Sequence, residues 1–262
     1  MEPSSTSMPI LDVPQNFPTP GRKSHRRRFL SLIRIGTVMG AIAFAAAPAR
    51  TVSAQRIEFD HFPETPVADA HVTAVLQDRV GFMWIGTQGD GLYRYDGYRF
   101  HEYEPVVGDP KTLPSSNITS LFEDSEGYLW ITSWQGVSRY DRKTDRFETW
   151  TMGDSDPWSN VVFQDTAGTI WIGSMDGLFT YDEIRGDVGP ALGNLGDAVG
   201  ASGVFDLLES VDGRLWVATD AGLLVHTPKT LEVTRSELPF TEITKIQEDR
   251  NGAIWASTPN AG

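Results

Sequence analysis

A short phrase, Gly-x-x-Trp, recurs five times along this chain of 262 residues. An Asp or Ser lies three residues before each glycine, and a second glycine follows each tryptophan by six or seven residues. Successive tryptophans are 46, 41, 45 and 39 residues apart, so the period lies in the forties. Such a period predicts a repeat fold in which every repeat is one supersecondary unit. The positions are Gly81 and Trp84, Gly127 and Trp130, Gly168 and Trp171, Gly213 and Trp216, and Gly252 and Trp255.

Each repeat contains short runs rich in β-branched and aromatic residues, separated by Gly, Asp, Ser and Asn. In the second repeat these runs are 118–123, 128–133, 137–141 and 146–150. No stretch after residue 54 shows a helical period over eleven or more residues. Four antiparallel strands per repeat are typical of a β-propeller blade. We therefore expect an all-β fold, an incomplete β-propeller of about four and a half blades within residues 55–262, with blades near 72–103, 118–150, 161–182, 203–235 and 243–262.

The recurring residues have structural explanations in such a fold. The Asp can accept hydrogen bonds from its own turn, the Gly accepts positive φ, and the Trp can fill space between blades. Trp171→Ala is then expected to destabilise the fold by about 3–5 kcal/mol. The third repeat lacks a clear fourth strand, because 183–202 is Gly-rich and irregular. Because the constant residues are structural, they form no shared catalytic set.

The phrase "DxxGxxWIGT" followed by "GLxRYD" resembles the repeat of the two-component regulator propeller family, and residues 76–100 are similar to its first blade. The resemblance implies the exported sensor part of a membrane-anchored histidine kinase or diguanylate cyclase, with seven blades as the usual number. Because the repeats stop at Gly262, we expect an N-terminal fragment without its output domain, whose open arc exposes strand edges. Residues 56–62 could supply a strand that completes the last blade. The alternative is a free periplasmic propeller that acts as a binding or scaffold protein.

Residues 1–54 have the order of an export signal. A Ser-, Thr- and Pro-rich start (1–21), expected to be disordered, precedes a cationic segment, a short apolar segment (35–49) and small residues ending at Ala54. "RRRFL" at 26–30 fits the twin-arginine motif and an ordinary Sec signal equally well. The body is therefore expected in the periplasm, and the parent protein in the inner membrane. Membrane contact would come only from a missing C-terminal segment or from an uncleaved signal.

Charge and composition narrow the function further. The net charge is −13, and residues after 54 carry 15 basic and 33 acidic side chains, which disfavours a nucleic-acid partner. The chain has no cysteine, and its histidines show no spacing typical of metal ligands. We expect no cofactor, no metal site, no catalytic residue and no enzymatic activity in this segment. The expected partner is a small molecule or glycan, and the full-length receptor could form a homodimer.

The predicted ligand-binding surface is the end of the propeller that carries the long inter-blade loops 104–117, 151–160 and 183–202. Two tryptophans outside the repeat register, Trp134 and Trp158, fall on this end. Aromatic faces beside hydrogen-bonding groups suit sugars and other flat polar ligands. The alternative is that both tryptophans only cap hydrophobic edges. The candidate ligand-binding residues are Trp134, Trp158, Asp154, Asp156 and Asp176.

Overall fold

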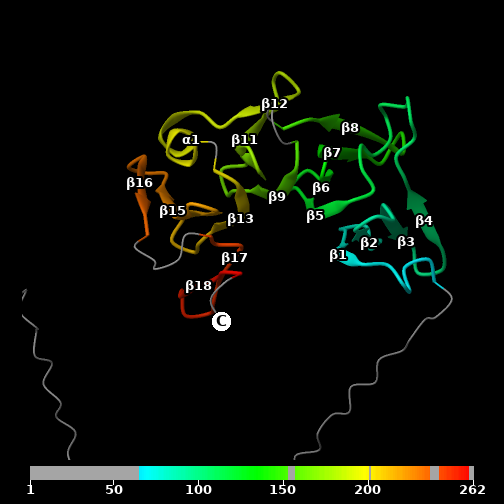
Figure 1. Ribbon diagram of the computed structural model, residues 1–262, viewed down its shortest axis with the longest axis horizontal. Coiled ribbons are helices and arrows are strands. Elements are labelled where there is room, and N and C mark those ends of the chain that lie inside the picture. The colour runs from blue at the N-terminus through cyan, green and yellow to red at the C-terminus, as the bar shows by residue number, and fades with distance from the viewer. Residues whose placement is uncertain (1–64, 153–156, 201, 237–241, 260–262) are drawn as a thin grey trace, which may run out of the picture. The chain divides into compact units, whose positions relative to one another are not determined.

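The computed structural model describes residues 65–152, 157–200, 202–236 and 242–259 (Figure 1). The chain divides between Glu58 and Phe59 into two units, and every described residue belongs to the second. The predicted export signal (1–54) and the predicted closing strand (56–62) therefore lie outside the described residues. No helix among the described residues is long and apolar enough to cross a bilayer.

The described chain forms four four-stranded sheets and one two-stranded sheet, here called blades 1 to 5. Blade 1 contains β1 (Val72–Gln77), β2 (Met83–Thr87), β3 (Leu92–Tyr95) and β4 (Phe100–Tyr103). Blade 2 contains β5 (Ile118–Glu123), β6 (Leu129–Ser133), β7 (Gly136–Asp141) and β8 (Arg146–Trp150). Blade 3 contains β9 (Ser159–Gln164), β10 (Ile170–Ser174), β11 (Gly177–Asp182) and β12 (Asp187–Pro190). Blade 4 contains β13 (Val204–Glu209), β14 (Leu215–Thr219), β15 (Gly222–Thr227) and β16 (Glu232–Arg235), and blade 5 contains β17 (Lys245–Glu248) and β18 (Ile254–Ser257).

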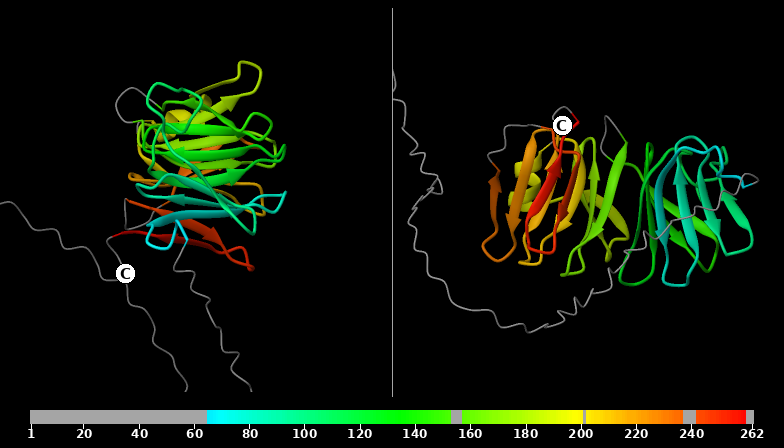
Figure 2. Two further views of the ribbon diagram at one scale, coloured as in Figure 1. Left: turned by 90° about the vertical axis from the view of Figure 1, so that its right-hand side faces the viewer. Right: turned by 90° about the horizontal axis from the view of Figure 1, so that it is seen from below.

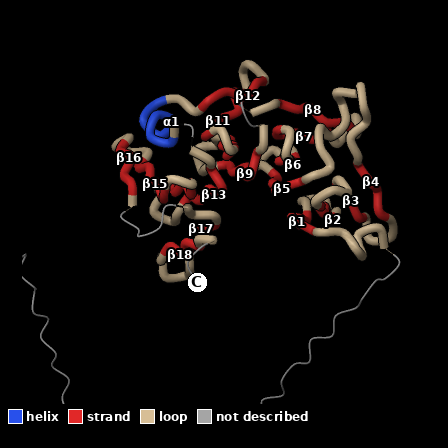
Figure 3. Tube along the Cα trace, in the orientation of Figure 1, coloured by secondary structure: helices blue, strands red, loops and turns tan. Residues whose placement is uncertain are grey.

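Every blade is an antiparallel meander in which sequential strands are hydrogen-bonded neighbours. The first strands of successive blades lie side by side, and the outer strands β4, β8, β12 and β16 lie furthest from them (Figures 1 and 2). The prediction of an all-β propeller is confirmed for the described residues, which are almost entirely strand and turn (Figure 3). This arrangement gathers the inter-blade loops and the turns between second and third strands at one end.

The prediction that the third repeat lacks a fourth strand is wrong. β12 pairs with β11 over four residues, from Asp182 with Asp187 to Phe179 with Pro190. The following Gly-rich stretch forms a short helix, α1 (Gly193–Val199), whose Leu195 and Val199 are buried. Strand pairing uses main-chain groups, so an edge strand such as β12 needs no apolar alternation. The helix is shorter than the window in which a helical period can be recognised.

The repeated Asp serves both its turn and the Trp. In blade 1, Asp78 Oδ1 accepts hydrogen bonds from the backbone N–H of Val80, Gly81 and Phe82 at 2.9–3.0 Å. Its Oδ2 accepts one from Trp84 Nε1 at 2.7 Å. The same indole bond recurs in blades 2, 3 and 5 at 2.8, 2.8 and 3.1 Å, and in blade 4 a serine hydroxyl replaces the carboxylate at 3.1 Å. The turn and the second strand are therefore fixed to each other in each repeat.

A second repeated bond joins each blade to the next. The last residue of every first strand from blade 2 onward is Glu or Gln, and its side chain accepts a backbone N–H from the turn of the preceding blade. We call this contact the turn latch. Its four distances lie between 2.7 and 2.9 Å, and the donor and acceptor pairs are Arg79 and Glu123, Ser125 and Gln164, Thr166 and Glu209, and Val211 and Glu248.

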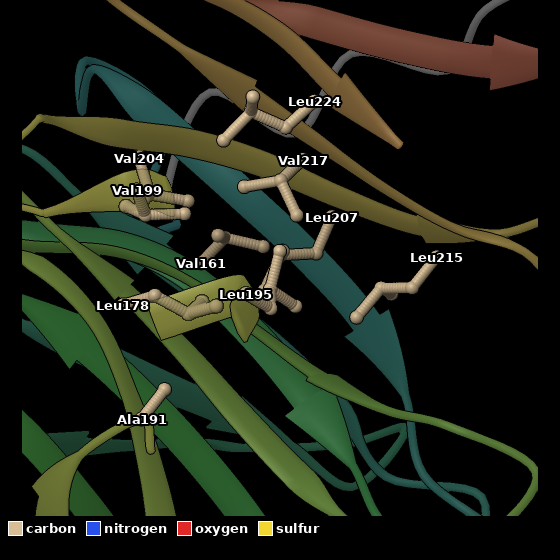
Figure 4. Packing of buried hydrophobic residues seen from close by; sticks show 10 residues of the cluster. All are labelled: Val161, Leu178, Ala191, Leu195, Val199, Val204, Leu207, Leu215, Val217 and Leu224. Carbon is tan, nitrogen blue, oxygen red and sulfur yellow. The ribbon is translucent and has the colours of Figure 1, made fainter. Parts of the chain in front are cut away.

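The hydrophobic core consists of clusters that each draw on neighbouring blades. The cluster between blades 3 and 4 is aliphatic and includes two side chains of α1, Leu195 and Val199 (Figure 4). The clusters between blades 1 and 2 and between blades 2 and 3 contain the fully buried Trp84 and Trp130. Trp255 on β18 is 67% exposed. The five repeat tryptophans therefore occupy equivalent strands but unequal environments.

Candidate ligand-binding face

The turns between second and third strands form a rigid part of the loop-bearing end. In blades 1 to 4 the last residue of the second strand is a buried Ser or Thr, and its hydroxyl donates to the carbonyl of the glycine that begins or precedes the third strand. In blade 2 a Cβ at Gly136 would lie 2.2 Å from the carbonyl oxygen of Trp150, and its φ is 122°. Only glycine fits there. The side chains between these residues are therefore held at defined positions.

Trp134 and Trp158 contact each other, although they come from different blades. Their ring centroids are 4.9 Å apart at an interplanar angle of 44°. Trp134 lies in the turn between β6 and β7 and is 37% exposed, and Trp158 lies directly before β9 and is partly buried. The structure thus brings together two of the predicted ligand-binding residues, and their indole rings form one aromatic surface.

Ser159 explains why the two tryptophans meet. Its buried hydroxyl accepts the backbone N–H of Ser133 at 3.1 Å and donates to the carbonyl of Gly136 at 2.7 Å. The start of β9 is therefore bonded to both sides of the turn that carries Trp134. The backbone N–H of Trp134 also donates to the Asn117 carbonyl at 3.2 Å, which connects the turn to the start of β5. The pair stands on hydrogen-bonded backbone rather than on a free loop.

The predicted acidic residues divide into two groups. Asp176 lies in the turn between β10 and β11, next to Met175, whose N–H donates to the Trp158 carbonyl at 2.9 Å. Its own N–H donates to Ser174 Oγ at 3.1 Å, so the turn is closed around it. Asp154 and Asp156 lie outside the described residues. Asp176 therefore follows the residue whose backbone N–H bonds to Trp158, and its role in binding stays a prediction.

A hollow of about 660 Å³ adjoins this face. It is lined by the loop between β4 and β5, by Gln135 and by Thr149. Gln135 follows Trp134, so the hollow begins beside the aromatic pair. The loop is internally bonded, since Val106 N–H donates to Thr112 Oγ1 at 3.0 Å. A hollow with apolar walls beside an aromatic surface is the usual form of a small-molecule site.

A second hollow, of about 390 Å³, lies among the five first strands. Three side chains on its wall bridge neighbouring blades by donating to backbone carbonyls. They are Thr73 to Ile118, Thr119 to Ser159 and Asn160 to Val204, at 2.7, 2.6 and 2.8 Å. Sequence reasoning missed these residues, although a polar residue at the second position of each of these first strands was a visible signal. Their donors are used within the wall, so they connect the blades.

A hydrogen-bonded polar cluster lies between the outer parts of blades 1 and 2. The hydroxyls of Tyr103 and Tyr140 both donate to Asp145 Oδ1, at 2.7 and 2.5 Å. Burial and these hydrogen bonds raise the pKa of both tyrosines, while the same bonds hold the pKa of Asp145 below its usual value against the opposing effect of burial. The hydroxyls therefore stay protonated and act as donors. His101 Nε2 lies 3.7 Å from Asp145 Oδ2 on this cluster, away from the loop-bearing face.

No group of three or more His, Asp or Glu side chains in the described ranges is arranged to hold a metal ion. The loop-bearing end carries the aromatic pair of Trp134 and Trp158 with its adjoining hollow.

Comparison with known proteins connects this geometry to a family. The family model for the two-component regulator propeller matches residues 66–89 and 112–135. These two segments contain the first and second strands of blades 1 and 2, with the Asp–Gly turn and the Trp between them. Residues 66–89 and 112–135 are therefore similar to two-component regulator propeller repeats. The resemblance seen in the sequence is thus confirmed. No curated protein matches the chain.

Solved structures share the propeller repeat fold. The extracellular domain of a hybrid two-component system from B. thetaiotaomicron is 22% identical with a TM-score of 0.57, covering 71% of this chain and 27% of that domain. A second such domain from B. thetaiotaomicron is also 22% identical with a TM-score of 0.57, covering 72% and 28%. Virginiamycin B lyase from Staphylococcus aureus is 17% identical with a TM-score of 0.56, covering 75% of this chain and 65% of the lyase. At these identities the likeness shows the fold alone, and the chain spans about a quarter of the two extracellular domains.

Proposed function

We propose that this chain is the ligand-sensing part of an extracytoplasmic propeller in a membrane-bound signal-transduction protein. The two-component regulator propeller repeats support this proposal, as does the likeness to extracellular domains of hybrid two-component systems. The output would be supplied by a histidine kinase or diguanylate cyclase part of the parent protein. The chain itself would bind a ligand without transforming it.

The observation that carries the binding proposal is the contact between Trp134 and Trp158. Two indole rings from neighbouring blades present a shared aromatic surface whose backbone is fixed by Ser159. Recognition residues on loops above a rigid scaffold are the usual arrangement in binding proteins. A sugar ring or another flat polar molecule could stack on the exposed part of Trp134 and extend toward Gln135 and the adjoining hollow. The ligand class proposed is therefore a glycan or a small polar molecule.

The position of the pair also suggests how binding could be transmitted. Ser159 joins the start of β9 to the turn of blade 2, so a ligand that contacts both tryptophans would bridge two blades. A ligand bound to both tryptophans would favour one relative position of blades 2 and 3. A ligand can shift an equilibrium between conformations only by its difference in affinity for them. Signalling would then depend on a small change in the packing of blade 2 on blade 3.

The proposal can be tested with oligosaccharide binding followed by intrinsic tryptophan fluorescence. Trp134→Ala and Trp158→Ala are expected to weaken binding by roughly tenfold or more, because each removes one ring of the stacking surface. Tyr98→Ala is the matched control, since Tyr98 is 93% exposed and lies between β3 and β4, away from the pair. In the full-length protein the same two tryptophan variants should lose the response to ligand while keeping the melting temperature within a few degrees of the parent. An unchanged response in both variants, or turnover of a substrate by the chain, would contradict the proposal.

A further inference from the structure

A surface hollow of about 700 Å³ lies along β8 and carries an unusual set of charges for this acidic chain. Its lining includes four cationic side chains and two acidic ones, whereas the whole chain has a net charge of −13. The hollow shares Pro110 and Thr149 with the hollow beside Gln135 but does not include Trp134 or Trp158. The charged residues in its wall are Lys111, Arg139, Lys143, Arg146, Asp141 and Glu148.

Both acidic residues of the hollow already have partners. Asp141 accepts the backbone N–H of Lys143 and the hydroxyl of Thr144, each at 2.8 Å. Glu148 is paired with Arg139 at 2.9 Å. Arg139 also donates to the Tyr181 hydroxyl at 3.0 Å, so this pair belongs to the packing of blade 2 on blade 3. Glu148 therefore offsets Arg139, and Asp141 keeps its negative charge beside Lys143, so the four cations and two acids of the wall leave it with a net positive charge.

Three cations at the rim remain available to a ligand. Arg146 Nη1 is 3.7 Å from Asp109 Oδ2, and both side chains are about half exposed, so this pair is weak. Lys111 and Lys143 are exposed, and among the described residues neither has an ion pair within 4.0 Å. Lys111, Lys143 and Arg146 thus border one hollow, and none of the three has an ion pair shorter than 3.7 Å among the described residues.

The backbone that carries these cations is held in place. The Lys111 carbonyl accepts the N–H of Phe147 at 3.0 Å, and the Lys111 N–H donates to Asp109 Oδ1 at 3.0 Å. Phe147 is buried, so the loop before β5 is fixed against β8. Tyr128, which is 38% exposed, forms a flat wall, with the Arg139 guanidinium 4.7 Å from its ring centroid. A fixed backbone lowers the entropy cost of binding, since only the side chains must be ordered.

Blade 4 shows that the turn itself does not require this charge cluster. Leu231 occupies the position of Asp145 in the turn before the fourth strand, and both residues have φ of 56°. Lys229 corresponds to Lys143, but Glu232 stands where blade 2 has Arg146. The same turn is therefore compatible with an acidic residue at this place. The cation cluster is a property of blade 2 rather than of the repeat.

We propose that the hollow along β8 is a binding site for a small multivalent anion with at least two oxyanion groups, such as carboxylates, sulfates or phosphates. Lys111 and Lys143 would act as mobile point charges, and the planar Arg146 guanidinium could hold one oxyanion through two hydrogen bonds. Tyr128 would contact the body of the ligand. A multivalent anion can form ion pairs with several of the rim cations at once, whereas a monovalent anion can pair with only one or two, so the multivalent anion should bind more tightly. The site does not depend on the role proposed for Trp134 and Trp158.

Calorimetric titration of the full chain with citrate, inorganic pyrophosphate and acetate tests the site. We expect citrate or pyrophosphate to bind more tightly than acetate, and the affinity to fall as salt is raised because screening weakens exposed charges. Lys111→Gln combined with Lys143→Gln should weaken that binding about tenfold, equivalent to about 1.4 kcal/mol. Lys229→Gln is the matched control and should leave it unchanged. The preferred probe then distinguishes a carboxylate ligand from a phosphate ligand.

Three results would overturn the proposal: neither multivalent anion binds, acetate binds as tightly as they do, or Lys229→Gln weakens binding as much as the double variant. Melting temperatures of the variants show whether the exposed substitutions disturb folding, and Arg146→Gln provides an independent variant if they do. Trp134→Ala should leave citrate and pyrophosphate binding unchanged. Failure of the anion site is therefore distinguishable from failure of the aromatic face.

Discussion

The interface between blades 1 and 2 and the interface between blades 3 and 4 have the same strand arrangement but different side chains packed between the sheets. Between blades 1 and 2, Arg94 lies opposite Trp84 in the strand pairing and donates to the Tyr140 hydroxyl of the next blade at 2.8 Å. Its guanidinium carbon is 5.6 Å from the Trp84 ring centroid, and Tyr103 stacks on the same indole at 5.6 Å. This interface is aromatic and polar.

Between blades 3 and 4 the equivalent positions hold Thr180, opposite Trp171, and His226. Among the described residues, no arginine side chain joins blade 3 to blade 4 by a hydrogen bond or an ion pair. Leu195 and Val199 of α1 enter an aliphatic cluster instead (Figure 4). Trp171 packs against this cluster and is only partly buried. Burial lowers the pKa of His226, which favours the neutral ring at this place.

The turn latch is the same in both interfaces, with 2.7 Å from Arg79 N to Glu123 and 2.7 Å from Thr166 N to Glu209. The relative position of neighbouring blades is thus supported by main-chain donors in the turns, while the space between the sheets can be filled in more than one way. The repeat therefore specifies the hydrogen bonds of the turns more strictly than the side chains packed between the blades. The turn latch is the same in both interfaces, whereas the side chains toward the outer strands and the loops differ between them.

The largest expected difference between the two interfaces concerns their tryptophans. Trp84→Ala should lower the free energy of unfolding by about 3–5 kcal/mol, because the side chain is fully buried and stacked. For Trp171→Ala the sequence suggested the same loss, but its partial exposure now predicts a smaller one, roughly 2–3 kcal/mol. Trp255→Ala, at 67% exposure, is the control and should change stability by about 1 kcal/mol or less. Urea unfolding measures all three, and equal losses at Trp84 and Trp255 would show that burial in the two blades does not differ as described.

The repeated turn residue should matter more in blade 1 than in blade 4. The Asp78 carboxylate is fully buried and pairs with Arg142 of blade 2 at 2.6 Å, besides holding its own turn. Asp78→Asn should therefore cost about 2–3 kcal/mol at neutral pH, because it removes the carboxylate charge and leaves Arg142 paired only with Glu123, at 2.8 Å. Ser210→Ala, at the same position of blade 4, should cost about 1 kcal/mol, because it removes no charge and loses the hydroxyl's bonds to Trp216 Nε1 and to the exposed Asp212 carboxylate.

The pH dependence of the Asp78 effect has a definite sign. Burial acts to raise the pKa of Asp78, but hydrogen bonds from Arg142 and Trp84 outweigh it and hold the pKa below the usual value of 3.8. The ionised carboxylate therefore stabilises the fold fully above that value, and the contribution is lost as the pH falls through the lower folded-state pKa. Unfolding curves of the parent and of Asp78→Asn should converge below about pH 3.8. A difference that grows on acidification would be incompatible with this assignment.

The smallest of the three effects concerns the glycine at the fourth position of the five-residue second strand in blades 1 and 3. A Cβ at Gly173 would lie 2.6 Å from Val204 Cγ1, and one at Gly86 would lie 2.6 Å from Ile118 Cγ2. Blades 2 and 4 have Thr132 and Ala218 at this position, so the frame accepts a side chain where the next blade leaves room. Gly173→Ala and Gly86→Ala should each cost about 1–3 kcal/mol through overpacking. Gly189→Ala in β12, where nothing lies within 4 Å of the added carbon, is the control, and a thermal shift as large as for Gly173→Ala would refute the steric argument.

Sequence reasoning predicted much of the fold because the repeat is periodic and local. Within ten residues, the Asp-x-x-Gly turn and the Trp on the short apolar strand that follows predict the local backbone structure. The same reasoning missed β12 and α1, since an edge strand with exposed residues and a helix of seven residues carry little periodic signal. It also missed the turn latch, although a Glu or Gln at the end of each first strand was visible. The acceptor lies some forty residues from its donor, and periodicity alone does not show which blade it contacts.

The candidate site was also predicted only in part from the sequence. The sequence indicated that Trp134 and Trp158 stand outside the repeat register and on the loop-bearing end, which was enough to select them. Their contact at 4.9 Å depends on Ser159 reaching the turn of the preceding blade. The hollow along β8 was not predicted, because Lys111 and Lys143 belong to separate turns. They line the same hollow only because the loop before β5 is hydrogen-bonded to β8.

By itself, then, the sequence determined the blade: its turns, its strand order and the residue that each turn holds in place are set by short-range hydrogen bonds and by backbone freedom at glycine. Only the tertiary structure decided how far each repeated tryptophan is buried, which interface contains an arginine and which a helix, and which charged side chains share one surface hollow. These features depend on neighbouring blades, and the chain between two contacting residues carries no local pattern that records their distance. Identical tryptophans therefore range from 0% to 67% exposed on equivalent strands.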